Sequence, residues 1–220
     1  MDYIKVLRKM CDVEPRFDKF MRTGTCASYA EFCEACCDYD EFSVVYEGRE
    51  LNLWLTCGVT KACIIIEDEP VVIKIGFSDF ALNHAIREAD IYWEAVEAGV
   101  DEFFAPCEKI GKIYNTDVFS MLLMNVDEER VSSDMFTRCS GSMSNDDIWE
   151  ALDCCEIVEN LFPTYYSLES VNKLLDFLYR RDVGDLHTGN IGYDDNGDIK
   201  LIDYSGYFPK CKEVYKADAS

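Results

Sequence analysis

The chain has 220 residues, of which 49% are hydrophobic and 29% are charged, and its formal net charge at pH 7 is −22. These values exclude a disordered chain and are typical of one globular domain or two small lobes. The strong negative charge argues against nucleic acid or an anionic membrane surface as a partner.

The sequence also bears on the location of the protein. The longest apolar runs, such as 119–124, are far too short to span a bilayer. The opening residues Met1-Asp2-Tyr3 do not begin a signal peptide. We therefore expect a cytoplasmic protein whose 12 cysteines are reduced thiols and not a disulfide framework.

Residues 1–43 predict a helical N-terminal extension that is separate from the remainder of the chain. Apolar residues recur there at helical spacing: Ile4, Val6, Leu7, Met10, Phe17, Phe20 and Met21.

A cysteine cluster comes after these apolar residues. Cys33, Cys36 and Cys37 form C-x-x-C-C, with Cys26 upstream. Structural zinc needs about four ligands, usually as two Cys or His pairs, and only one such pair is present. Buried thiols on a helix face are the simpler interpretation, and a zinc site is the alternative.

From about residue 42 the pattern changes to short β-like runs at 51–56, 61–66 and 71–75. Gly58 lies between the first two runs, where a glycine fits an ordinary turn or a loop that covers phosphates. Two more strands are expected, at 107–113 and 117–124.

Lys74 lies in the otherwise apolar run V-V-I-K-I. A buried ammonium group needs an anionic partner, unless the strand is at an edge and the side chain reaches water. A helix is predicted over 81–99, closed by Gly99. Glu88 falls on its small and aromatic stripe, so we expect it to pair with Lys74, with Glu94 as the second choice. The stripe is Ala85, Glu88, Tyr92 and Ala95.

The polar segment 127–145 contains a charge run and many Ser and Gly residues, and it predicts a loop or short insertion. Two helices are expected after it, at 146–162 and at 168–181. The second comes directly after Ser167, which is a suitable N-cap.

Polar residues of three kinds gather between Val183 and Gly206. Asp185 and Asn190 are five residues apart in D-L-H-T-G-N, and a hairpin is predicted over 191–202 with the turn D-D-N-G. Its Asn-Gly pair favours a tight turn in which both residues adopt positive φ. The second strand ends on Asp203. Two carboxylates and an amide at one end of a short hairpin can hold divalent metal ions and orient a hydroxyl group.

The segments D-L-H-T-G-N and L-I-D-Y-S-G resemble the catalytic centre of kinase-like enzymes, close to the G-D-L-H-x-G-N form of aminoglycoside and choline kinases. The resemblance implies that Asp185 is the catalytic base and that Asn190 and Asp203 bind Mg²⁺. It places His187 where many protein kinases have a lysine that reaches the γ-phosphate. A solvated Asp/Asn/Gly hairpin is the alternative.

The same resemblance gives roles to upstream residues. Lys74, held by Glu88, would contact the α- and β-phosphates of ATP, and Gly58 would lie in the phosphate-covering loop. The backbone of Met124 and Val126 would meet the adenine. The segment R-E-A-D-I-Y-W-E-A also resembles the helix that carries the glutamate in the small-molecule kinases.

The chain departs from the family pattern in three ways. Val183 replaces the usual histidine, Asp203-Tyr204-Ser205 replaces Asp-Phe-Gly, and only 204–220 come after Asp203. A protein kinase would continue there with an activation segment and the helices that bind a peptide substrate.

The resemblance implies an α+β, two-lobed protein kinase-like fold. Its parts would be the extension at 1–43, a small β-rich N-lobe at 44–126 and a truncated α-rich C-lobe at 127–220. The implied function is an Mg·ATP-dependent phosphotransferase acting on a hydroxyl acceptor that is a protein Ser/Thr or a small molecule. The alternatives are a nucleotide-binding pseudokinase or interaction module, and an acidic inhibitor that mimics nucleic acid.

Overall fold

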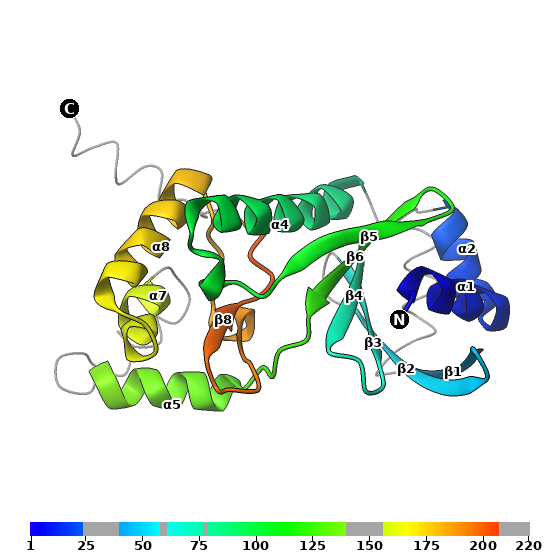
Figure 1. Ribbon diagram of the computed structural model, residues 1–220, viewed down its shortest axis with the longest axis horizontal. Helices are drawn as coiled ribbons and strands as arrows, with labels where there is room; N and C mark the ends of the chain where they lie inside the picture. Colours follow the sequence, from blue (N-terminus) through cyan, green and yellow to red (C-terminus); the bar gives the residue numbers. More distant parts are fainter. Residues whose placement is uncertain (24–39, 58–60, 77–78, 140–155, 207–220) are drawn as a thin grey trace. The chain divides into compact units, whose positions relative to one another are not determined.

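The computed structural model describes residues 1–23, 40–57, 61–76, 79–139 and 156–206 (Figure 1). It is a mixed α+β structure that divides into two compact units. Unit 1 comprises Met1–Ala89 and Pro106–Leu123, and unit 2 comprises Asp90–Ala105 and Met124–Ser220. The long helix α4 (Asp79–Ala98) therefore contributes residues to both units. None of the helices in the described part of the chain is both long and apolar enough to cross a bilayer.

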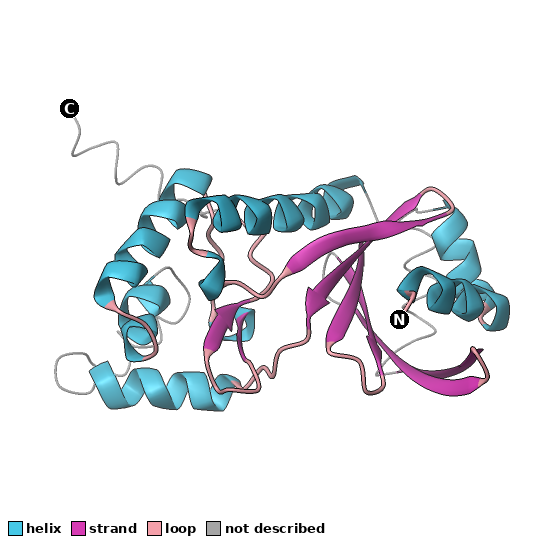
Figure 2. Cartoon of the chain, viewed as in Figure 1, coloured by secondary structure: helices cyan, strands magenta, loops and turns pink. Residues whose placement is uncertain are grey.

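Unit 1 is built on a six-stranded antiparallel sheet of order β1-β2-β3-β4-β6-β5. Its strands are β1 (Asp40–Tyr46), β2 (Arg49–Cys57), β3 (Lys61–Ile66), β4 (Val71–Gly76), β5 (Cys107–Ile113) and β6 (Thr116–Leu122). The five strands expected from the apolar runs are confirmed, and β1 is an additional edge strand. The twisted sheet is drawn in magenta in Figure 2.

Two helices, α1 (Tyr3–Val13) and α2 (Pro15–Thr23), pack on this sheet. Their apolar faces share one core with β-strand residues. The members from the helices are Val6, Leu7, Met10, Cys11, Phe17, Phe20 and Met21. The helical prediction is confirmed, but these helices are part of unit 1 and not a separate extension. An amphipathic helix buries its apolar stripe on whatever face is available, and sequence periodicity does not say which face that is.

Local geometry explains how closely α1 approaches the sheet. The pairing of β5 with β6 shifts register between Lys109 and Gly111, and Gly111 has φ +152°. A Cβ atom there would lie 3.2 Å from the side chain of Ile4. Gly111 thus provides both the bulge conformation and the space that Ile4 occupies.

Unit 2 contains the helices α5 (Glu128–Cys139), α7 (Glu156–Leu161) and α8 (Leu168–Arg181) and the hairpin β7 (Ile191–Tyr193) and β8 (Ile199–Leu201). The expected helix at 168–181 is confirmed to the residue, and Ser167 caps it by accepting from the amide of Ser170 at 3.1 Å. The helix expected over 146–162 is described only over α7, because 146–155 lie outside the described residues.

The prediction of a loop over 127–145 is wrong for α5. Asp127 caps this helix, since its carboxylate accepts from the amide of Arg130 at 2.9 Å. Val131 and Met135 are fully buried. Two apolar residues four apart are enough to anchor three turns of helix in a packed unit, although the surrounding sequence is polar.

Candidate functional site

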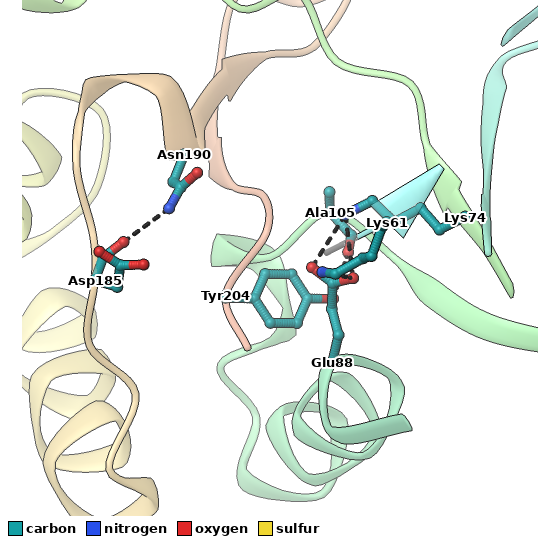
Figure 3. Close-up of polar contacts among 7 residues, drawn as sticks. All are labelled: Lys61, Lys74, Glu88, Ala105, Asp185, Asn190 and Tyr204. Carbon is teal, nitrogen blue, oxygen red and sulfur yellow. Dashed lines mark hydrogen bonds and ion pairs between the residues drawn. The ribbon is translucent and has the colours of Figure 1, made fainter. Parts of the chain in front are cut away.

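Glu88 is the centre of a buried ion cluster in unit 1 (Figure 3). Lys74 Nζ lies 3.1 Å from Glu88 Oε1, and Lys61 Nζ lies 3.1 Å from Glu88 Oε2. Glu88 is 0% exposed, Lys61 is 4% and Lys74 is 6%. The expected pairing of Lys74 with Glu88 is therefore confirmed, and Lys61 is a third member that the sequence analysis missed.

Strand register explains why both lysines reach one carboxylate. Cys63 is the direct partner of Lys74 across β3 and β4, and Lys61 is two residues before Cys63. Side chains two residues apart on a strand share a face, so Lys61 and Lys74 occupy diagonal positions on the same face of the sheet. Lys61 was overlooked because a lysine at the start of a strand usually extends into solvent.

The stripe predicted for α4 is confirmed at three of its four positions, and the fourth, Tyr92, is half-buried. Ala85, Glu88 and Ala95 are buried along it. Glu94 forms an ion pair with Arg181 within unit 2 instead. Glu94 is therefore not the partner of Lys74, because its carboxylate is paired with Arg181 on α8.

In unit 2, the loop 183–190 begins where α8 stops. Asp182 has φ 57°, and the amide of Val183 donates to the carbonyl oxygen of Leu178 at 2.9 Å. This is the Schellman pattern, in which a left-handed residue ends a helix and the next apolar residue packs back on its last turn. Val183 is fully buried, so it serves as the apolar anchor of the loop.

The loop then presents Asp185 on an exposed position with φ 57°, a backbone conformation that is uncommon outside glycine. Asn190 Nδ2 donates to the backbone carbonyl oxygen of Asp185 at 2.7 Å (Figure 3). His187 Nδ1 accepts from the amide of Gly189 at 3.1 Å. Asn190 and His187, which were predicted to be functional residues, therefore also stabilise the conformation of the loop that contains them.

Asp203 comes directly after the hairpin, as expected. The amide of Ile202 donates to the carbonyl oxygen of Asn190 at 2.8 Å, which brings the backbone on either side of the hairpin together just before Asp203. Asp203 is exposed and has φ 50°. Tyr204, next in the chain, is fully buried and donates to the carbonyl oxygen of Ala105 at 2.8 Å. The buried ring thus fixes the backbone beside an exposed carboxylate.

The turn between β7 and β8 differs from the expected one. Gly197 has φ +83°, but Asn196 does not adopt positive φ. The carboxylate of Asp194 accepts from the amides of Asn196 and Asp198, at 2.8 and 3.0 Å. These side-chain bonds stabilise a wider turn, which removes the need for two left-handed residues.

Gly206 lies against the loop that holds Asp185. A Cβ atom at Gly206 would be 2.5 Å from Asp185 Cβ and 3.0 Å from the carbonyl oxygen of Gly184. The amide of Gly184 donates to the carbonyl oxygen of Gly206 at 3.1 Å. The segment after Asp203 can therefore approach the loop only because residue 206 has no side chain.

The residues of unit 2 suit a hard cation such as Mg²⁺. Asn190 donates to Asp185 through Nδ2, so Oδ1 is the atom of this side chain that could act as a ligand, and Asp203 has a carboxylate. Mg²⁺ takes one or two such protein oxygens and completes its shell with phosphates and water. Among the described residues, no group of three or more His, Cys, Asp and Glu side chains forms a metal site.

The predicted adenine segment lies where unit 2 resumes at Met124. The amide and carbonyl of Asn125 bond to Tyr193, at 3.0 and 2.8 Å. Asn125 forms an isolated antiparallel bridge with Tyr193, and Met124 and Val126 flank it in the chain. Within the described residues, neither has a backbone–backbone hydrogen bond.

Two other predictions concern parts of the chain that are not described. Gly58 lies outside the described residues, as do Cys26, Cys33, Cys36 and Cys37.

Comparison of the chain with protein-family models, with curated proteins and with solved structures finds no match.

Proposed function

We propose that the protein is an Mg·ATP-dependent phosphotransferase of kinase-like fold that transfers the γ-phosphate to a hydroxyl acceptor. The observation that carries this proposal is the buried pair of Lys74 and Glu88, at 3.1 Å. Burying an ammonium group and a carboxylate is rarely justified by stability alone, because apolar residues of similar size stabilise as well or better. A lysine held in place by a carboxylate is suited to contact phosphate oxygens.

The loop and hairpin of unit 2 support the other roles. Asp185 would accept the proton of the attacking hydroxyl, and Asn190 and Asp203 would bind Mg²⁺. The exposed positions of Asp185 and Asp203 make their carboxylates accessible, while their positive φ values are held by buried neighbours. Backbone strain that the surroundings maintain is common at functional sites. His187 would donate toward the terminal phosphate.

The charge of the chain fits an Mg²⁺-dependent reaction. With a net charge of −22, the surface repels a free nucleotide. A bound Mg²⁺ neutralises phosphate charge, and Lys74 supplies positive charge where the α- and β-phosphates would lie. Met124 and Val126 would offer backbone groups to adenine. The acceptor would be a protein Ser/Thr or a small molecule, in the cytoplasm.

Mass spectrometry of the purified protein after incubation with Mg·ATP tests the proposal, together with an ADP-release assay. Phosphate incorporation or ADP release by the wild type should be lost in Lys74→Met. Lys112→Met is the matched control, because Lys112 is also a strand lysine of unit 1 in an ion pair, 3.1 Å from Asp117. Activity that survives Lys74→Met would overturn the assigned role of Lys74.

A nucleotide-binding protein without catalysis is the second candidate. It is favoured by Val183, which is fully buried at the position where the resemblance expects a histidine. The valine side chain anchors the loop there but has no polar group. This candidate predicts Mg·ATP binding with no turnover on any acceptor. An acidic nucleic-acid mimic, by contrast, predicts no Mg·ATP binding.

A further inference from the structure

Glu128 connects helix α5 to the loop that contains the proposed catalytic residues. Thr188 Oγ1 donates to Glu128 Oε2 at 3.0 Å, across 60 residues of sequence. A Cβ atom at Gly189 would lie 3.6 Å from Glu128 Oε1. The two oxygens of one carboxylate therefore lie against two successive residues of the loop. Both α5 and the loop belong to unit 2.

Helix α5 holds Glu128 in a defined position. Glu128 is in the first turn of this helix, where the helix dipole stabilises a negative charge. Further along α5, the guanidinium group of Arg130 lies 3.7 Å from the ring centroid of Tyr193, and Asp134 accepts from the hydroxyl of Tyr165 at 2.7 Å. The helix is thus joined to the hairpin and to the segment before α8, so Glu128 reaches the loop from an anchored element.

Thr188 lies within a tight turn formed by residues 187–190. The amide of Asn190 donates to the carbonyl oxygen of His187 at 2.8 Å, and the amide of Gly189 donates to His187 Nδ1 at 3.1 Å. A Cβ atom at Gly189 would lie 3.1 Å from His187 Cε1, so the ring lies directly against the backbone of the turn. Because Nδ1 is the acceptor in this bond, Nε2 is the ring nitrogen that can donate to a phosphate.

We propose that Glu128 is a positioning residue, which holds the turn 187–190 through Thr188 and so keeps the ring of His187 in place for phosphoryl transfer. The inference rests on the proposed function for the role of His187. Asn190 is held separately, by its 2.7 Å bond to the backbone of Asp185 (Figure 3). Loss of the contact from Glu128 should therefore displace His187 more than the proposed Mg²⁺ ligand, and should affect transfer more than nucleotide binding.

Glu129 separates this role from a simpler one. An acidic residue in the first turn stabilises a helix through the helix dipole, whatever else it contacts. Glu129 is also acidic, exposed and in the first turn of α5, and its side chain has no hydrogen bond or ion pair to another described residue. Glu129→Ala removes the effect on the helix and leaves the contact to the loop intact, which makes it the matched control for Glu128→Ala.

Steady-state kinetics of the full chain with Mg·ATP give the first test. Glu128→Ala should lower kcat about 10-fold or more and change the KM for ATP by less than about 2-fold. Thr188→Val should have the same effect, and the double variant should fall no further, because both changes remove one interaction. Glu128→Gln keeps an acceptor and Thr188→Ser keeps the hydroxyl, so each should retain most of the rate. Glu129→Ala should behave like the wild type.

Hydrogen exchange of the loop amides gives a second test that needs no turnover. The amides of Gly189 and Asn190 both bond to His187 and should exchange slowly in the wild type. They should exchange about 10-fold faster in Glu128→Ala and in Thr188→Val, and at the wild-type rate in Glu129→Ala. The amides of α8 should stay as protected as in the wild type, which shows that each variant is folded.

The outcomes separate the two proposals. Unaltered exchange of the loop amides in Glu128→Ala would overturn the inference, whether or not the protein has turnover. If the wild type has no turnover but exchange rises as expected, the hold of Glu128 on the turn stands and the phosphotransferase proposal fails.

Two further results would overturn the inference and leave the phosphotransferase proposal in place. The first is an active wild type whose kcat is unchanged in Glu128→Ala, since transfer would then not depend on the hold that Glu128 provides. The second is an equal loss of kcat in Glu128→Ala and Glu129→Ala, which would assign the effect to the stability of α5.

Discussion

Asn190 Nδ2 lies 2.7 Å from the backbone carbonyl oxygen of Asp185, to which it donates a hydrogen bond. Asn190 is 6% exposed, so this bond ties a buried amide to the loop that presents the proposed base. The residue proposed to bind the metal therefore also positions the residue proposed to accept the proton.

Asn190→Asp keeps a side-chain oxygen but removes the donor. We expect the free energy of unfolding to fall by about 1–3 kcal/mol, because a carboxylate oxygen would face a carbonyl oxygen in a buried place. Urea unfolding measures this loss. Asn196→Asp, in the turn of the same hairpin, is the control and should change stability little. An Asn190→Asp variant as stable as the wild type would mean that the bond to Asp185 is unimportant.

Asp185→Asn should lower turnover while leaving Mg·ATP affinity nearly unchanged. A positioned base typically contributes about 10²- to 10⁴-fold, and the amide keeps the shape of the side chain. Steady-state kinetics and calorimetry measure the two quantities. Asp182→Asn is the matched control, since Asp182 has the same φ of 57° and lies directly before the loop that contains Asp185. His187→Ala should reduce turnover less than Asp185→Asn. Unchanged turnover in Asp185→Asn would place the base elsewhere.

Asp203→Asn should weaken the stabilisation that Mg·ATP gives to the folded protein. A ligand that binds only the folded state raises the melting temperature by an amount that grows with its affinity. The wild type should show this rise with Mg²⁺ or Mn²⁺ and lose it with EDTA. Asp195→Asn, at an exposed turn position, should behave like the wild type. An equal rise in EDTA would contradict a metal-bridged nucleotide.

Gly206→Ala should reduce turnover by displacing Asp185. The new Cβ would lie 2.5 Å from Asp185 Cβ, a separation that requires one of the two segments to move. A displacement of about 1 Å at a catalytic group can lower the rate about 100-fold. Gly48→Ala is the control: its φ of +81° makes it strained, but nothing lies within 4 Å of the added atom. It should lower stability and leave turnover intact.

Tyr3→Phe should destabilise unit 1 in a pH-dependent way. The Tyr3 hydroxyl donates to Glu69 Oε2 at 2.9 Å, and burial, together with this bond, raises the pKa of Tyr3 to about 12. A raised pKa means that the folded state favours the neutral phenol. The contribution of Tyr3 is thus complete below its unfolded pKa of about 10 and is lost as the pH rises toward about 12.

The difference in unfolding free energy between wild type and Tyr3→Phe measures this contribution. It should be about 0.5–1.5 kcal/mol at pH 8 and should shrink above pH 10. If this difference in unfolding free energy grew with pH, the folded state would favour the charged phenolate of Tyr3, which would contradict its raised pKa.

Much of the local structure was predictable from the sequence. The strands at 61–66 and 107–113 and the helix at 168–181 have the predicted bounds, because apolar periodicity and caps are local properties. The pairing of Lys74 with Glu88 was predictable for a related reason. A lysine in an apolar strand needs an anion, and helix phase places Glu88 on the buried stripe.

The rest depended on contacts between distant segments. Lys61 joins the cluster only because β3 pairs with β4 in a register that puts it diagonal to Lys74. The positions of α1 and α2 on the sheet, the helix α5, and the close approach of Gly206 to Asp185 have the same origin. Sequence periodicity determines which face of an element is buried, whereas only tertiary packing determines what that face meets.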